Sequence, residues 1–138
     1  MMVPVVLVIA GCRGSQQSPA QTGNATMYRN MGAMYSQYVA EHGNQPPPSE
    51  QAFREFLGSK RDELEKSGLT VEKMFVSPRN GQPMEWMYKK VPTGPMGMTY
   101  FAYEKEPVDG QRLALANRGM YELMDEAKFR SVFSNVTK

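Results

Sequence analysis

The sequence predicts an α+β fold in which amphipathic helices pack on an antiparallel sheet and a last helix closes the chain. Apolar residues recur at helical spacing up to residue 64, alternate in short segments between residues 84 and 124, and return to helical spacing after residue 125. Helices and strands do not alternate along the chain, so a parallel sheet is not expected. With 138 residues, 41% hydrophobic and 22% charged, the chain suits one globular domain.

The first predicted helix covers residues 27–43 and organises the rest of the chain. Eight of its residues share one apolar arc of about 140°: Met27, Tyr28, Met31, Met34, Tyr35, Tyr38, Val39 and His42. Gly43 can end the helix in the left-handed conformation, and three prolines at positions 46–48 prevent it from resuming. A stripe this wide needs a sheet to cover it.

A second amphipathic helix is expected to begin after Ser49, a good N-cap residue, and to end near Gly68. Lys60 falls within its apolar arc and is expected to lay its stem over that surface. Its apolar face consists of Phe53, Phe56, Leu57 and Leu64. Thr70 could then cap a single turn before an extended pair at residues 75–76.

The Asn80-Gly81 dipeptide, flanked by prolines at 78 and 83, predicts a tight turn ahead of the sheet. Strands are expected at 84–89, 98–105, 112–116 and 120–124, the last three forming a meander and the first adding a fourth strand. Strict alternation in the second strand assigns Tyr100 and Ala102 to one face and Phe101 and Tyr103 to the other.

Asp125 is expected to cap the last helix. That helix has an apolar face of Phe129, Val132, Phe133 and Val136.

The N-terminus carries a short apolar run, residues 3–10, that ends in Gly11-Cys12 and turns abruptly polar. Ile9-Ala10-Gly11-Cys12 resembles the lipobox of bacterial lipoproteins. This resemblance implies a signal peptide at 1–11, a diacylglycerol thioether on Cys12, a flexible tether at 12–26 and a single domain at 27–138. Arg13 is not the aspartate of inner-membrane retention signals, so the outer membrane is the expected address. The alternative is a buried N-terminal strand with a free thiol.

Other motifs resemble the head domains of type II secretion pseudopilins and of pseudopilin-like envelope proteins. They span residues 27–133 and comprise Tyr35-x-x-Tyr38, Glu41-His42-Gly43 with the following prolines, the 77–83 turn, the 103–112 hairpin and the strand at 120–123. The chain lacks the prepilin cleavage site and the long hydrophobic helix of that family. The resemblance therefore implies a pilin-like head on a lipid anchor that does not polymerise.

Several classes of function are not expected. His42 is the only histidine and Cys12 the only cysteine, which leaves no Ser-His-Asp triad, Cys/His catalysis or usual zinc site. Within the chain, His42 is expected to interact with the last carbonyls of its helix. The net charge of +2 with interspersed signs does not indicate a nucleic-acid binder, and no apolar run approaches the length of a membrane span. No cofactor is expected.

The leading expectation is a lipid-anchored, non-enzymatic envelope protein that contacts an envelope partner through exposed loops. The candidate contact residues are Arg79, Asn80, Gly81, Pro95, Met96 and Met98. One alternative is a small peptidoglycan hydrolase that uses paired carboxylates from Glu104, Glu106 and Glu122, although the favoured interpretation of these residues is a solvated strand end with cross-strand charge pairing. A Cu(I) carrier is another, since thioethers are soft ligands. Its donors would come from Met27, Met31, Met34, Met84, Met87, Met96 and Met98.

Overall fold

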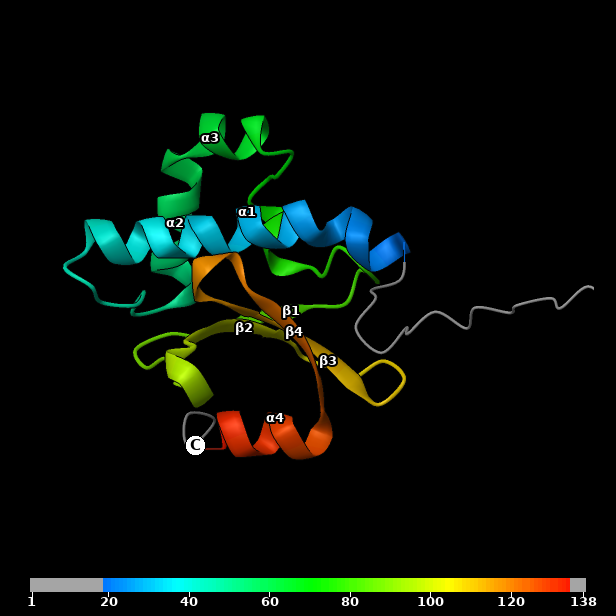
Figure 1. The fold of residues 1–138 in the computed structure, drawn as a ribbon. Coiled ribbons are helices and arrows are strands. Elements are labelled where there is room, and N and C mark those ends of the chain that lie inside the picture. Colours follow the sequence, from blue (N-terminus) through cyan, green and yellow to red (C-terminus); the bar gives the residue numbers. More distant parts are fainter. Residues whose placement is uncertain (1–18, 135–138) are drawn as a thin grey trace, which may run out of the picture.

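A computed structural model describes residues 19–134, and its three layers are two helical layers on either side of one sheet (Figure 1). The expected α+β class is confirmed. The helices are α1 (Pro19–Glu41), α2 (Glu50–Ser59), α3 (Arg61–Lys66) and α4 (Glu126–Phe133), and the strands are β1 (Met84–Trp86), β2 (Tyr100–Glu104), β3 (Gln111–Ala116) and β4 (Tyr121–Asp125). The 3₁₀ turns are η1 (Glu72–Phe75), η2 (Pro95–Gly97) and η3 (Asn117–Gly119). Cys12, Arg13 and Val136 lie outside the described residues.

The sheet is an antiparallel meander in the order β1-β2-β3-β4, which confirms the predicted three strands and the added fourth. β1 is shorter than the predicted 84–89 and stops at Trp86. The physical reason lies at Lys89, which takes a left-handed conformation (φ +66°) and donates its N–H to the Pro47 carbonyl at 3.0 Å. The chain therefore leaves the sheet toward the proline segment instead of extending the ladder.

The predicted faces of β2 are wrong for both pairs of residues, because Tyr100 and Tyr103 pack on the α4 side of the sheet and Phe101 and Ala102 on the α1 side. The β2–β3 register shifts between Tyr100 and Ala102, so the strand bulges at Phe101. Phe101 consequently turns to the α1 side, where its ring lies 4.4 Å from that of Tyr35. Tyr103 faces α4 instead, with its ring 4.8 Å from that of Phe133. An extra residue in one strand moves the following side chains to the opposite face from strict alternation.

Helix α1 begins at Pro19, inside the stretch that was expected to be a flexible tether. The tether prediction for 12–26 is therefore wrong for residues 19–26. Proline is well suited to the first position of a helix, and adding turns to a formed helix is easier than nucleating one. The packed part of α1, from Tyr28 (3% exposed) onward, supports these additional turns.

The predicted second helix is two helices, because the chain breaks at Lys60 (φ −109°, ψ +25°). Gly58 and Ser59 are weak helix formers, and the Ser59 hydroxyl donates to the Phe56 carbonyl at 2.6 Å. The expected Ser49 cap is confirmed by the Ala52 N–H at 3.1 Å from its Oγ. Thr70 likewise caps a single turn, η1, although Phe75 lies inside that turn and not in an extended segment.

Buried side chains cover both faces of the sheet. On the α1 side the largest are Tyr35, Phe53 and Trp86, and on the α4 side Tyr100 and Phe133. The Tyr35 hydroxyl donates to the Met87 carbonyl at 2.7 Å, which ties α1 to the end of β1. The predicted Asp125 cap of α4 is confirmed by the Lys128 N–H, 2.8 Å from its Oδ1.

Candidate functional site

Glu104 at the end of β2 is the one charged side chain among residues 19–134 that is fully buried, with 0% exposed. The expectation of a solvated strand end is wrong for this residue. Arg79 donates from Nε to both carboxylate oxygens at 3.1 and 3.0 Å and from Nη2 to Oε1 at 2.5 Å. The Leu113 N–H of β3 donates to Oε1 at 2.7 Å. The Glu104 carboxylate thereby connects Arg79 to the edge of β3.

The predicted tight turn at 77–83 places Arg79 over this carboxylate. The Gly81 N–H donates to the Ser77 carbonyl at 2.8 Å, with Gly81 in the left-handed region (φ +70°) that a side chain disfavours. Val76 pairs with Pro83 across the base of the turn. The Arg79 side chain is only 15% exposed, so it is part of the fold and not a free contact residue.

Burial raises the pKa of the Glu104 carboxyl, but the hydrogen bonds from Arg79 and from the Leu113 N–H outweigh it and hold that pKa below its ordinary value. Glu104 is therefore ionised at neutral pH. A general acid in glycoside hydrolysis needs the opposite shift.

The other two carboxylates of the hydrolase alternative lie elsewhere. Glu122 pairs with Ala114 in the β3–β4 register, on the α4 face, and accepts from the Tyr100 hydroxyl at 2.8 Å. Burial, followed by this contact with Glu122, raises the pKa of Tyr100 to about 12. Glu104 faces α1, so the sheet separates it from Glu122, and Glu106 is exposed in the turn after β2. The three do not form a pair that could flank one glycosidic bond.

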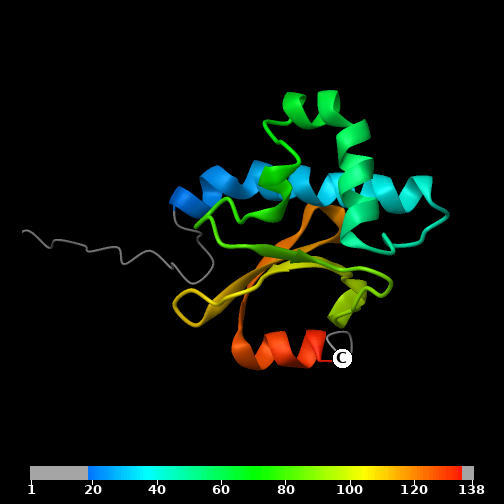
Figure 2. The same cartoon turned by 180° about the vertical axis from the view of Figure 1, so that it is seen from behind.

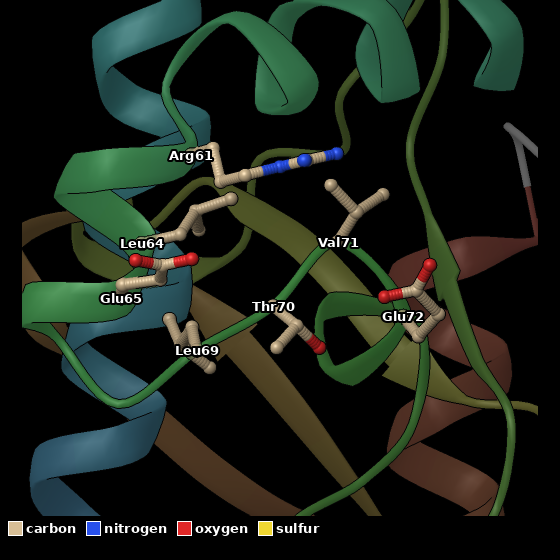
Figure 3. A pocket seen from close by; sticks show the side chains of 7 residues that line it. All are labelled: Arg61, Leu64, Glu65, Leu69, Thr70, Val71 and Glu72. Atoms are coloured by element: carbon tan, nitrogen blue, oxygen red, sulfur yellow. The ribbon is translucent and has the colours of Figure 1, made fainter.

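A pocket of about 230 Å³ opens between α3 and the start of η1 (Figure 3). In Figure 3, Arg61 extends over Leu64 toward Val71, while Glu65 and Glu72 lie at opposite sides of the opening. The Thr70 hydroxyl in its wall already accepts the Lys73 N–H at 3.1 Å. The pocket thus combines an apolar floor of Leu64 and Leu69 with charges of both signs, and it lacks a set of groups aimed at one ligand atom.

A second hollow, here called the α1–η1 groove, has a volume of about 300 Å³ and an apolar floor. It is lined by Asn24, Met27, Leu69, Lys73, Val76 and Pro78. The lining comes from two segments that are distant in sequence, α1 and residues 69–78, which is why sequence analysis did not find it. The one local sign of this groove is Val76, an apolar residue that lies outside the predicted amphipathic helices and is exposed.

A third, more open hollow lies between the end of α1 and α2, beside His42. The His42 ring stacks on Tyr38 at 3.8 Å, and its Nδ1 lies 2.8 Å from the Tyr38 carbonyl oxygen. The expected role of His42 at the helix end is confirmed.

The predicted contact residues occupy opposite ends of β1. Arg79, Asn80 and Gly81 precede the strand, near the first turns of α1, whereas η2 with Pro95 and Met96 follows it at the other end (Figure 2). Met96 is 98% exposed and left-handed (φ +61°), and Met98 is half-buried against the α4 side.

The methionines of the copper alternative do not converge on one point. Met31, Met34 and Met84 are buried on the α1 side of the sheet, and Met87 is buried on the α4 side.

Within the described range 19–134, no three His, Cys, Asp or Glu side chains gather as a metal site. In the same part of the chain, none of the helices combines the length and apolar character needed to cross a bilayer. Comparison of the chain with protein-family models, with curated proteins and with solved structures finds no match.

Proposed function

We propose that this chain is a lipid-anchored cell-envelope protein that binds an envelope protein partner without catalysis. Cys12 carries the acyl anchor, and the loops at the end of the domain farthest from that anchor form the contact surface. The observation that carries the proposal is the course of α1, which connects these two ends of the domain (Figure 1).

The length of α1 sets the separation between the ends. Its 23 residues, from Pro19 to Glu41, correspond to about 35 Å at the usual helical rise. Its first residue lies seven positions after Cys12. Its last turn leads into the proline segment, which is hydrogen-bonded to Lys89. A lipid on Cys12 would therefore leave the loops around Lys89 and Met96 facing away from the bilayer.

Backbone strain collects at this far end. Among residues 19–134, five residues other than glycine have positive φ, and three of them, Asn44, Lys89 and Met96, belong to these loops. Such conformations persist where the surrounding structure imposes them, and they gather at binding surfaces. Hydrogen bonds from Gly94 N–H to the Met98 carbonyl (2.7 Å) and from Tyr100 N–H to the Pro92 carbonyl (3.1 Å) hold the base of the loop.

Met96 is the centre of the proposed contact surface. At 98% exposed, its thioether side chain presents nearly its whole surface to solvent on a loop with a fixed base. Methionine is flexible and polarisable, and it is common on surfaces that adapt to a partner. Lys89 and Lys90, which precede this loop in the chain, are exposed and add positive charge.

The experiment has two readouts. Intact mass and membrane fractionation in a Gram-negative host, beside Cys12→Ala, test the anchor: the expected result is a lipid-sized mass increase on a chain that begins at Cys12. A photo-crosslinking residue in place of Met96, compared with the same residue in place of Met120 (51% exposed), tests the contact surface. A soluble, unmodified chain refutes the anchor, and equal crosslinking from both positions refutes the loop.

A further inference from the structure

We infer that the α1–η1 groove lies on the membrane surface and is filled by the acyl-chain boundary of the bilayer. The inference rests on the proposed function and names the orientation of the anchored domain. Val76, at 38% exposed, is one of three large hydrophobic side chains that the described residues leave exposed, and it lines this groove. The other two, Met96 and Met120, lie outside the groove.

The distance along the chain places the groove within reach of the anchor. Six residues, 13–18, separate Cys12 from Pro19, and whatever their conformation they span at most about 25 Å between those two Cα atoms. Asn24, which lines the groove, follows five residues into α1, or about 7.5 Å along its axis. The far loops are separated from this end by the length of α1. Among the hollows described, the α1–η1 groove is therefore the one that combines an apolar floor and an exposed apolar side chain with a position near the anchor.

The lining has the chemistry of a membrane interface. Leu69 forms an apolar floor, Met27 is partly buried, and Val76 reaches outward. The exposed Lys73 at the rim supplies an ammonium group for lipid phosphate. An apolar surface bordered by a cation is the arrangement with which a protein settles into the headgroup layer.

The bilayer, and not the anchor's own acyl chain, is the occupant. Each methylene of that chain is already favourably buried in the membrane, and withdrawing the chain into the groove would give up this burial. Contact of the groove with the bilayer surface requires no such withdrawal. It also covers Val76 and Met27, which water otherwise reaches.

The test exploits the single cysteine. Because the thioether occupies the Cys12 sulfur in the lipidated protein, a cysteine introduced elsewhere is the only free thiol. Val76→Cys and Lys73→Cys on the groove, with Met96→Cys at the far loop as the matched control, are labelled with bimane. The lipidated proteins are inserted in phosphatidylglycerol–phosphatidylcholine vesicles that contain doxyl-labelled lipids. Thermal unfolding of each variant, compared with the parent protein, verifies the fold.

The expected result is strong quenching of bimane at positions 76 and 73 and little at position 96. Equal, weak quenching at all three positions in protein whose mass shows the lipid would overturn the orientation and leave the proposed function standing. Stronger quenching at 96 than at 76 would reverse the orientation. A second bimane on an unmodified Cys12, seen by mass, would refute the anchor and with it this inference.

Discussion

Replacing Glu104 by glutamine removes the negative charge of the buried ion pair while keeping the size of the side chain. Arg79 would then be left with 15% of its side chain exposed and no anion beside it, and the Leu113 N–H would lose its charged acceptor. Breaking a buried pair by removing one partner costs about 3 to 5 kcal/mol. We expect Glu104→Gln to lower the free energy of unfolding by that amount, which is a large share of the stability of a domain of this size.

Urea denaturation followed by Trp86 fluorescence measures this loss, because Trp86 is the only tryptophan and is 1% exposed in the core. The matched control is Glu106→Gln, two residues away and exposed, which should change stability by less than about 0.5 kcal/mol. The double variant Arg79→Met/Glu104→Leu removes both charges, and we expect it to be more stable than Glu104→Gln alone. A Glu104→Gln variant as stable as Glu106→Gln would refute the account of this ion pair.

The pH dependence of the difference in stability between the parent protein and Glu104→Gln gives an independent check. The pKa of Glu104 is lowered on folding from an ordinary value of 4.5, so the folded state binds this proton less readily than the unfolded chain does. The stabilisation is fully present above pH 4.5 and is lost as the pH falls through the lowered pKa. The gap between the parent and Glu104→Gln should therefore be constant near neutrality and shrink in acid. A gap that widens in acid would contradict the direction of the shift.

Three further substitutions test other parts of the fold, each by urea denaturation. Tyr35→Phe leaves the buried Met87 carbonyl without its donor and should cost about 1 to 3 kcal/mol; no loss would show that this hydrogen bond contributes nothing. Gly58→Ala should instead stabilise by about 0.5 to 1 kcal/mol, because the added Cβ meets no atom within 4 Å in a helix, and a loss would contradict the open space there. Asp125→Ala removes the cap on the Lys128 N–H and should cost about 0.5 to 2 kcal/mol, unlike Asp125→Asn, which should keep most of the cap.

Local chemistry determined much of the fold, and this is why the sequence could predict it. The Ser49 and Asp125 caps and the Asn80-Gly81 turn each depend on residues within a few positions of one another. Hydrogen bonds of this range form in the same way whatever the rest of the chain does. The helix start at Pro19 was missed because tertiary packing further along α1 extends a weakly helical segment.

Other features of the fold were decided by tertiary structure alone. Alternation predicts the faces of a regular strand, but the bulge at Phe101 is fixed by pairing with β3 and by packing on Tyr35. No local pattern marks Glu104 as buried, because its partner Arg79 lies 25 residues earlier and is aimed at it by the turn.

For the candidate site, too, some features could be predicted from the sequence and others depend on the fold. The sequence by itself indicated an anchor at Cys12 and an exposed loop at Met96. Only the fold placed the 77–83 turn and the η2 loop at opposite ends of β1 and assembled the α1–η1 groove from α1 and residues 69–78. Grooves and buried ion pairs form between residues that are far apart in the sequence. Local sequence patterns do not show which of these residues come into contact.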